Sequence, residues 1–413
     1  MSVMEALELG TVQQLESERL LQTYERNPIL LTHGRGCYLY DATGKEYLDL
    51  LSGIGVTALG HAHAAVTETI AQQAERLLHT SNLFYHEFQS ELAQKLTKIS
   101  GLSRAFFCNS GTEAVEGSLK LARAYARSQQ PDSKRPKWRI LAFDNSFHGR
   151  TYGSVSITST KKYRAPFAPL MPGVRFVKSN NAADFDKKLD ASVCAVVLEV
   201  IQGEGGIRLM DPGFVQHVRE ATKNSGALLI ADEIQSGLGR TGNWFAYQMY
   251  DIVPDIATVA KPLGNGLPLG AILVSEQVAS AIHPGMHGTT FGGGPLTCAV
   301  ALKVLETIEK ESLLAHNSEV GTYFRSRLEE LKAKHKFVRQ VRGAGLMIGV
   351  EVDKVDRAKA IVKQAMSHGV ILNRTNDKVL RFLPPFIITR QQIDHAVEVL
   401  EAVFGQVEKK NAK

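Results

Sequence analysis

The sequence predicts an α/β protein with a mostly parallel sheet, followed by a smaller α+β region near the carboxyl terminus. From about residue 100, short apolar runs alternate with amphipathic helical stretches, as in parallel sheets covered by helices. Two of the apolar runs, residues 227–231 and 256–260, end directly in charged residues, Asp232 and Lys261. The chain has 413 residues, of which 44% are hydrophobic and 22% charged, which is enough for two or three domains with ample core.

The first hundred residues are predicted to contain a polar arm, a hairpin and amphipathic helices. Residues 36–53 alternate apolar and polar side chains around a turn at residues 41–44, which indicates two paired strands. Because this hairpin precedes the main sheet and has no obvious partner there, we expect it to pack with the carboxyl-terminal region. The helices expected here cover residues 12–24, 66–78 and 88–96, the first of them stopped at Pro28.

The rest of the chain divides into two regions by its pattern. The strands expected in the middle are residues 104–108, 139–143, 195–200, 227–231 and 256–260, with helices over residues 111–127 and 214–224. A long helical stretch after Pro295 leads to residues 338–352 and 371–382, which alternate with helices and end in a helix over residues 391–404. The predicted domains are residues 1–65 (arm and hairpin packing with the small domain), 66–300 (large domain with a seven-stranded type of sheet) and 301–413 (small α+β domain).

Composition and short motifs limit the kinds of partner that this protein is expected to bind. The net charge of +6 is modest for this length, and the densest basic patch, residues 134–139, is interpreted as a solvated loop without a nucleic-acid motif. We therefore expect neither nucleic acid nor membrane as a partner, since no apolar run is long enough to span a bilayer. His61 and His63 lack further ligands nearby, so no metal site is expected. The four cysteines form no CxxC pair, which favours buried thiols in the cytoplasm: Cys37, Cys108, Cys194 and Cys298.

The two strand-end charges predict a shared site. The carboxyl ends of parallel strands meet at one edge of a sheet, so Asp232 and Lys261 are expected to lie close together. An acid and an amine brought together in this way suit a carbonyl cofactor with a basic ring nitrogen.

A second stretch, residues 108–116, could bind a phosphate. A predicted strand ends there, Ser110, Gly111 and Thr112 form a turn, and a helix begins. The free backbone N–H groups of the first helical turn and the two hydroxyl groups would cradle an anion. The same letters also fit an ordinary capping box, so this motif alone leaves both interpretations open.

Three more stretches carry candidate ligand-binding residues. Residues 145–151 place Phe147, His148 and Arg150 after a strand, where a ring could be stacked and a carboxylate clamped. Without other information this segment is equally an ordinary polar loop. The remaining candidates are Glu199 and Glu204 in LEVIQGEGG, Thr290 in HGTTFGGGP, and Arg381, whose apolar strand VLRF implies an acidic partner or an anionic ligand.

Together these stretches resemble the class III family of pyridoxal-phosphate-dependent aminotransferases, in its acetylornithine/ornithine aminotransferase group. The similarity covers nearly the whole chain, and its blocks stand in family order: YLYDATGKEYLDLLSGIG, LGHAH, HTSNLFY, FCNSGTEAVEGSLKLAR, FHGRT, QGEGG, ADEIQSGLGRTG, AKPLGNGLPLGA, TTFGGGPLTCAVA, VRGAGLMIGVE and LRFLPP. Each motif is weak by itself, but the ordered set is specific. The resemblance implies the fold type I transferase fold and a homodimer with active sites shared between subunits.

The resemblance also implies residue roles. Lys261 would form the Schiff base with pyridoxal 5'-phosphate and then serve as the catalytic base, while Asp232 would pair with the protonated pyridine nitrogen. The other residues implied at the cofactor are Gln235 near the ring hydroxyl, Phe147 stacked on the ring beside His148, Ser110, Gly111 and Thr112 at the phosphate, and Thr290 reaching the phosphate from the other subunit. At the substrate, Arg150 and Arg381 would bind carboxylates, and Glu204 would lie nearby. Glu199 would pair with Arg381 when that arginine is not needed.

The choice of substrate rests on Ile54. Ornithine aminotransferases carry a tyrosine at this position, which would contact a free α-amino group, whereas Ile54 suits an acylated α-amine. Arg150 would then bind the α-carboxylate of N2-acetylornithine, and 2-oxoglutarate would accept the terminal amine. Gly294 and Val200 depart from the family pattern, an asparagine and a proline. Because of these two departures, other amino donors stay open as alternatives: succinylornithine, succinyl-diaminopimelate, ornithine, 4-aminobutyrate and carrier-bound lysine precursors.

Two rival functions belong to other classes. An aminomutase or decarboxylase could use the same cofactor, but the FHGRT and QGEGG blocks speak against it. A catalytically silent scaffold would be expected to lose Lys261 or Asp232, and both are present.

Overall fold

The central layer of the molecule is a seven-stranded sheet with the strand order β4-β12-β11-β10-β7-β5-β6. The computed structural model describes residues 8–134 and 136–410. In the sheet, β12 runs antiparallel to both of its neighbours and the other pairs are parallel. Its strands are β4 (Arg104–Cys108), β5 (Arg139–Phe143), β6 (Val174–Val177), β7 (Val193–Leu198), β10 (Leu228–Asp232), β11 (Ile256–Val259) and β12 (Gly270–Val274).

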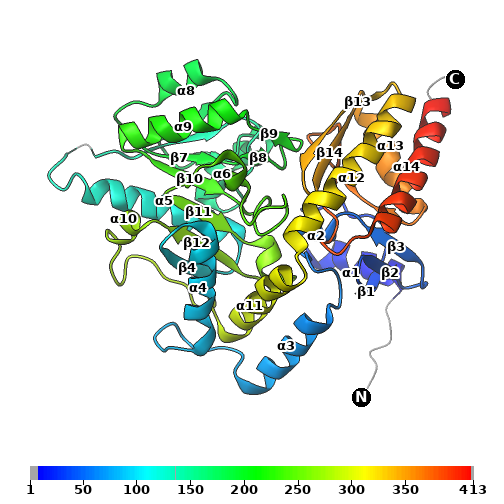
Figure 1. Ribbon diagram of the computed structural model, residues 1–413, viewed down its shortest axis with the longest axis horizontal. Helices are drawn as coiled ribbons and strands as arrows, with labels where there is room; N and C mark the ends of the chain where they lie inside the picture. Colours follow the sequence, from blue (N-terminus) through cyan, green and yellow to red (C-terminus); the bar gives the residue numbers. More distant parts are fainter. Residues whose placement is uncertain (1–7, 135, 411–413) are drawn as a thin grey trace.

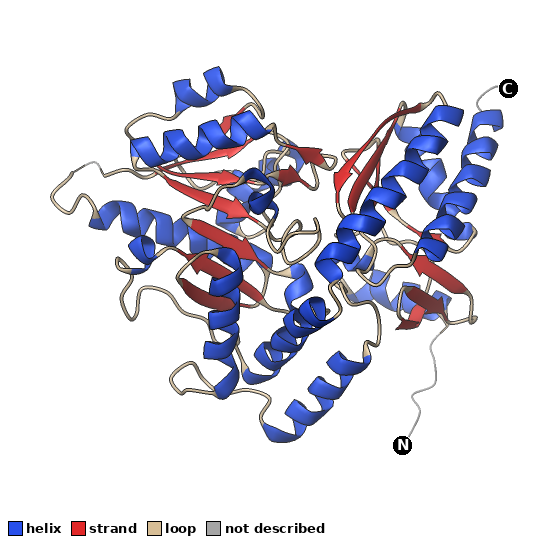
Figure 2. Cartoon of the chain, viewed as in Figure 1, coloured by secondary structure: helices blue, strands red, loops and turns tan. Residues whose placement is uncertain are grey.

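Apolar cores lie on both faces of this sheet. Along β7, Val196 and Leu198 join one core while Ala195 and Val197 join the other, because successive side chains of a strand point to opposite faces. This two-sided burial explains why the strands read as continuous apolar runs. The helices α5 (Gly111–Ser128), α8 (Ala182–Lys188) and α9 (Pro212–Ser225) pack around the sheet (Figures 1 and 2). We call the sheet with these helices the large part.

A second layered unit, the small part, contains most of the carboxyl-terminal region. Its antiparallel sheet has the order β13-β14-β17-β16. Figure 1 shows its three long helices side by side next to this sheet. Its elements are β13 (Val338–Ala344), β14 (Met347–Val352), β16 (Asn373–Thr375), β17 (Val379–Phe382), α12 (Leu313–Lys334), α13 (Val355–Ser367) and α14 (Arg390–Lys410).

The amino-terminal hairpin joins the small part. The strands β1 (Leu31–Arg35), β2 (Tyr38–Asp41) and β3 (Glu46–Asp49) form a meander, and β3 pairs in parallel with β15 (Val370–Ile371). The packing expected for the hairpin is therefore present. The domain boundaries at residues 65 and 300 stay a prediction.

The predicted helix over residues 12–24 is wrong in its bounds, because α1 covers Leu9–Arg19. The side-chain amide of Gln22 donates to the carbonyls of Glu16 and Leu20, so it occupies carbonyl groups at the helix end and the chain turns away there. No residue of α1 is buried, so no packing energy extends the helix further.

Helix α11 (Pro295–Lys310) connects the two parts. Cys298, Leu302 and Leu305 belong to the core of the large part, while Val300 and Val304 belong to the core of the small part. An apolar face on each side makes this helix a shared wall rather than a linker. In Figure 1, α11 lies where the large and small parts meet.

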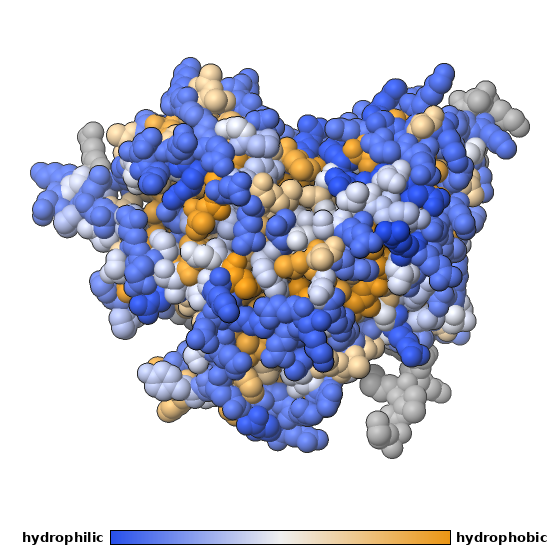
Figure 3. Space-filling model, in the orientation of Figure 1, coloured by the Kyte–Doolittle hydropathy of each residue, from blue (hydrophilic) through white to orange (hydrophobic). Residues whose placement is uncertain are grey.

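The remaining elements are short or peripheral. Within the described residues, no helix is long and apolar enough to cross a membrane. Figure 3 shows a mostly hydrophilic periphery, with apolar side chains visible along the middle of the face. The other bounds are α2 (Ser52–Gly55), α3 (Ala64–Arg76), α4 (Glu87–Ser100), α6 (Tyr152–Ile157), α7 (Lys161–Arg164), η1 (Ala165–Phe167), β8 (Ile201–Gln202), β9 (Arg208–Leu209), η2 (Ala246–Tyr250), η3 (Lys261–Gly264) and α10 (Glu276–Ala279).

Candidate active site

A cavity of about 430 Å³ opens at the carboxyl ends of the central strands. The loops after β4, β5, β7, β10 and β11 all contribute to its walls, as expected for a site in an open α/β sheet. Most of the predicted site residues line it: Ser110, Gly111, Thr112, Phe147, His148, Arg150, Glu199, Glu204, Asp232, Gln235 and Lys261.

Asp232 and Lys261 are brought to the same edge by neighbouring strands. β10 and β11 pair in parallel with Asp232 opposite Thr258, so Asp232 at the end of β10 and Lys261 just after β11 both reach the cavity. The amine of Lys261 has no hydrogen-bond acceptor among the described residues. Burial lowers the pKa of Lys261, and the neighbouring Glu204 carboxylate acts in the opposite direction. A lowered pKa favours the unprotonated amine, the form that acts as a nucleophile and a base.

His148 holds the carboxylate of Asp232 in place. Its Nδ1 lies 2.7 Å from Asp232 Oδ2, and both side chains are buried. The backbone N–H of Ile234 donates to the other Asp232 oxygen at 3.2 Å. Burial lowers the pKa of His148, but the hydrogen bond to Asp232 and the charges of Asp232 and Glu199 outweigh it, so the pKa is raised overall. The pair therefore fixes the orientation of the Asp232 carboxylate at the cavity.

The start of α5 forms a cradle for an anion. Ser110 is the N-cap, and its hydroxyl accepts from the backbone N–H of Glu113 at 3.3 Å. The N–H groups of the first helical turn, at Gly111 and Thr112, have no partner inside the helix. A Cβ at Gly111 would lie 2.8 Å from the side chain of Ile234, so this turn admits only glycine without rearrangement.

The hydroxyl of Thr112 is engaged elsewhere. It lies 2.9 Å from Thr151 Oγ1 and 2.6 Å from Ser154 Oγ, and it accepts from the backbone N–H of Arg150. These contacts tie the start of α5 to the loop after β5, which carries Phe147 and Arg150. Thr112 therefore offers its backbone N–H to an anion while its side chain fixes the neighbouring loop.

Arg150 is held by aromatic rings. Its guanidinium lies 3.7 Å from the ring centroid of Tyr163 and 5.6 Å from that of Phe147. Stacking of this kind restrains a flexible, exposed arginine without using its hydrogen-bond donors. The side chain stays available to bind a carboxylate at the cavity.

The predicted pairing of Glu199 with Arg381 is wrong in this structure. Glu199 accepts from the backbone N–H groups of Phe147 at 3.0 Å and of Gly203 at 3.3 Å. Burial raises the pKa of Glu199 to about 7, although the charge of His148 opposes this. Glu199 thus braces the two loops on either side of the cavity.

Glu204 is the acidic partner of Arg381. The two side chains form an ion pair, and Arg381 is 1% exposed. Arg381 also donates to Asn373 Oδ1 at 3.1 Å and to Gln235 Oε1 at 3.5 Å. Burial raises the pKa of Glu204, but the charge of Arg381 and its hydrogen bond outweigh this and lower it overall. The turn around Gly203 brings Glu204 to Arg381 on β17 of the small part, whereas Glu199 lies at the end of β7 in the large part.

Three predicted residues, Ile54, Thr290 and Arg381, are absent from the residues lining this cavity, although Arg381 bonds to the lining residues Glu204 and Gln235. Thr290 is exposed, in the loop before α11. Ile54 is 36% exposed and lies in the left-handed region with φ of +68°. Its near neighbour Val56 lines the cavity instead.

Some lining residues had no signal in the sequence. Tyr163 contacts Arg150 from beyond a helix, and only the tertiary structure joins them. Val56, Asn109, Leu267 and Pro268 line the cavity as ordinary loop residues. Hydrophobic or amide side chains outside a charged motif carry no pattern from which sequence reasoning could have selected them.

Comparisons with known proteins bear on this geometry. The sequence model of the family described as aminotransferase class III matches residues 21–404. The chain is a class III aminotransferase. The acetylornithine aminotransferase of Aquifex aeolicus is 46% identical over 385 residues, covering 93% of this chain and 99% of the relative. That of Methanocaldococcus jannaschii is 44% identical over 395 residues, covering 96% and 98%.

Solved structures agree with the fold of this class III aminotransferase. The ornithine aminotransferase of Toxoplasma gondii ME49 matches with a TM-score of 0.94 at 30% identity, covering 98% of this chain and 97% of that chain. The N-acetylornithine aminotransferase of Stenotrophomonas maltophilia K279a matches with a TM-score of 0.82 at 33% identity, covering 96% and 99%. The predicted fold, a pyridoxal-phosphate transferase with a seven-stranded sheet and a smaller α+β part, is confirmed.

The enzyme is pyridoxal-phosphate-dependent, and its cavity fits that cofactor. Backbone N–H groups of Gly111 and Thr112 suit a phosphate. The buried Asp232 carboxylate, oriented by His148, suits a cationic ring nitrogen. The unpaired amine of Lys261 suits an aldehyde.

Proposed function

We propose that this enzyme is an N2-acetylornithine:2-oxoglutarate aminotransferase, which gives N-acetylglutamate semialdehyde and glutamate and serves arginine biosynthesis. The observation that carries the proposal is the unequal state of two arginines, Arg150 in the cavity wall and Arg381 bonded to the lining residues Glu204 and Gln235. Arg150 keeps its donors free at the cavity, whereas Arg381 is occupied by Glu204. A donor with one carboxylate far from its reacting amine needs only Arg150. A dicarboxylate acceptor can use both.

Ile54 and the curated relatives support the choice of donor. An isoleucine offers no hydrogen bond to a free α-amine, so an acylated amine meets no penalty beside it. Several relatives that are 42–46% identical over nearly the whole chain are named acetylornithine aminotransferase. The rival donors are succinylornithine, succinyl-diaminopimelate, ornithine, 4-aminobutyrate and a carrier-bound lysine precursor.

The chain's own residues would act in a defined order. When bound, pyridoxal phosphate supplies a carbonyl carbon for the substrate amine and a ring that accepts electrons. Lys261, with its lowered pKa, would hold the cofactor and then accept and return a proton at its Nζ. Asp232, oriented by His148, would keep the ring side of the cavity negative. Glu204 would leave Arg381 when a second carboxylate arrives.

We also propose a homodimer that completes the site. The exposed side chains of Leu83, Phe84 and Phe291 form an apolar surface next to exposed Thr290. The two loops that carry these residues are joined by hydrogen bonds from Asn82 to the carbonyls of residues 289 and 292. A partner would cover this surface and bring Thr290 toward a neighbouring phosphate cradle. Sedimentation equilibrium tests this, because a monomer at micromolar concentration would contradict it.

A cytoplasmic location is part of the same proposal. All four cysteines are free and buried, and burial raises the pKa of Cys37, Cys108 and Cys298 to about 12 and that of Cys194 to about 11. Such thiols are unreactive and fit a reducing compartment.

The donor is tested with a panel of ω-amines and 2-oxoglutarate as acceptor. We expect the highest kcat/KM for N2-acetylornithine, with release of glutamate. Ile54→Tyr should shift the ratio of kcat/KM toward ornithine. An enzyme that uses ornithine or 4-aminobutyrate far better than acetylornithine would overturn the proposed donor while leaving the reaction type intact.

The role of Lys261 has a separate test. Lys261→Ala should remove the absorbance of the covalently held cofactor and abolish turnover, since no other amine replaces it in the cavity. Lys303→Ala is a matched control, because that lysine lies partly exposed on α11, outside the cavity, and forms an ion pair with Glu306. Turnover retained by Lys261→Ala would refute the assignment.

A further inference from the structure

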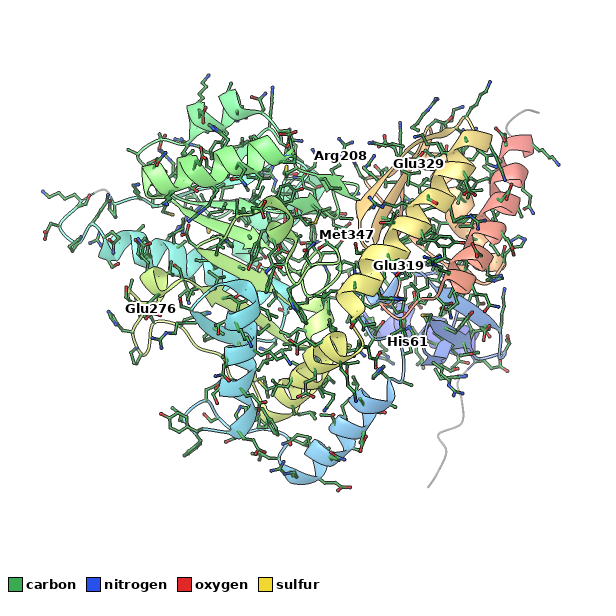
Figure 4. All side chains as sticks on the ribbon, in the orientation of Figure 1. His61, Arg208, Glu276, Glu319, Glu329 and Met347 are labelled. Atoms are coloured by element: carbon green, nitrogen blue, oxygen red, sulfur yellow. The ribbon has the colours of Figure 1, made fainter. Side chains whose placement is uncertain are left out.

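A second cavity, of about 460 Å³, lies between the large and small parts and is lined by three arginines. Arg208 comes from β9 of the large part, while Arg325 on α12 and Arg342 on β13 come from the small part. Figure 4 shows Arg208 at the junction of the two parts. Asn180 and Gln340 add amide groups to the wall. This cavity is separate from the candidate active site and shares no lining residue with it.

Each guanidinium donates to a backbone carbonyl at this cavity, Arg208 from an exposed position and the other two from partly buried ones. The bonds are Arg208 Nε to Gly205 (3.1 Å), Arg325 Nη1 to Gly343 (2.7 Å) and Arg342 Nε to Gly206 (2.8 Å). Fixed guanidinium groups lose little conformational entropy when they bind a ligand.

Positive charge exceeds negative charge around this cavity. Among the described residues, only Glu351 forms an ion pair with any of the three arginines, at 2.7 Å from Arg342 Nη1. Arg325 Nε and Arg342 Nη2 are buried without a hydrogen-bond partner in the described structure. Buried guanidinium donors without a partner carry a desolvation cost, and clustered like charges repel one another. An anion in the cavity would relieve the repulsion between these like charges.

We propose that this cavity binds a small, multiply charged anion with phosphate or dicarboxylate chemistry. Guanidinium groups recognise such oxyanions through paired N–H donors. The volume lies in the range of small-molecule sites, roughly 300–1,000 Å³. Because Arg208 belongs to the large part and the other two to the small part, the bound anion links the two parts. The site does not depend on which amino donor the enzyme uses.

The test measures inorganic phosphate binding to the holoenzyme at constant ionic strength, with chloride as the reference anion. We expect one phosphate per chain by calorimetry and a thermal midpoint raised by phosphate but not by chloride. Arg208→Gln and Arg325→Gln, made singly, should each raise the Kd about tenfold, since each removes charged hydrogen bonds to the anion. Arg390→Gln is the control, because it removes an exposed arginine paired with Glu319.

A phosphorus NMR competition distinguishes the two kinds of ligand. Malonate that displaces bound phosphate at lower concentration assigns the site to dicarboxylates, and failure to displace it assigns the site to phosphates. The proposal is overturned if wild-type holoenzyme binds no phosphate beyond the chloride reference. It is equally overturned if both arginine variants bind phosphate as tightly as the Arg390→Gln control.

Discussion

Replacing Glu204 with glutamine removes the charge that occupies Arg381 while keeping the size of the side chain. Glu204 forms an ion pair with Arg381, so under the proposed function a carboxylate of the keto acid would have to displace Glu204 to bind Arg381. The lowered pKa of Glu204 keeps it ionised at neutral pH, so this competition is always present. Glu204→Gln should therefore strengthen binding of 2-oxoglutarate.

The magnitude follows from the geometry of the pair. Two unit charges about 3 Å apart attract by about 5 kcal/mol at an effective dielectric constant near 20. The Glu204 side chain is 31% exposed, so solvent screens the pair, and desolvation offsets more of the attraction. A remaining difference of about 1.5–3 kcal/mol corresponds to a ten- to hundredfold lower dissociation constant for 2-oxoglutarate.

The assay follows each half-reaction separately by the absorbance of the cofactor. The dissociation constant of 2-oxoglutarate should fall in Glu204→Gln, and glutamate should become a better amino donor because Arg381 is open to its carboxylate. Glu199→Gln is the matched control, since Glu199 contacts the backbone of Phe147 and Gly203 and not Arg381. An unchanged constant in Glu204→Gln, or a fall only in Glu199→Gln, would refute this reasoning.

Three further predictions concern stability. His148→Asn should lower the free energy of unfolding by about 3 kcal/mol near pH 6, because it leaves the buried Asp232 carboxylate without its charged partner. The folded-state pKa of His148 is raised, so the stability it adds is complete below its unfolded pKa of about 6.5 and is lost as the pH rises through the folded value. Urea titrations should therefore show a deficit that shrinks at alkaline pH, and a constant deficit contradicts the pairing. Gly292→Ala should lower the unfolding free energy by about 1–3 kcal/mol, because its Cβ would lie 2.5 Å from a backbone oxygen of β4. Gly288→Ala is the control: its Cβ would meet open space, so its unfolding free energy should be nearly unchanged in the same titration. Ile54→Asn should raise the thermal midpoint, because a β-branched residue in the left-handed region costs about 1–2 kcal/mol that asparagine largely avoids. An unchanged or lower midpoint would count against backbone strain at this position.

The resemblance and the strand pattern together predict much of this protein's structure. The strands Arg104–Cys108 and Arg139–Phe143 match their expected bounds, because strands buried on both faces form apolar runs with sharp ends. Asp232 and Lys261 follow such runs, so parallel pairing places them together. Local sequence suffices here, since a strand's end determines where its last residue lies.

Other features were decided only by tertiary structure. Glu199 and Glu204 are the same kind of residue in one short segment, and only the path of the chain around Gly203 determines which one meets Arg381. The stacking of Tyr163 on Arg150 joins segments with no shared pattern.

The arginine cavity between the large and small parts is the clearest case of a feature that no sequence pattern predicts. Its three arginines are scattered among ordinary surface charges in the sequence, and only the packing of β9 against β13, which α12 adjoins, collects them. Sequence alone determined which chemical groups each strand end carries and hence the cofactor chemistry. Tertiary structure decided which charges face one another, because pairing between distant segments depends on packing and not on local pattern.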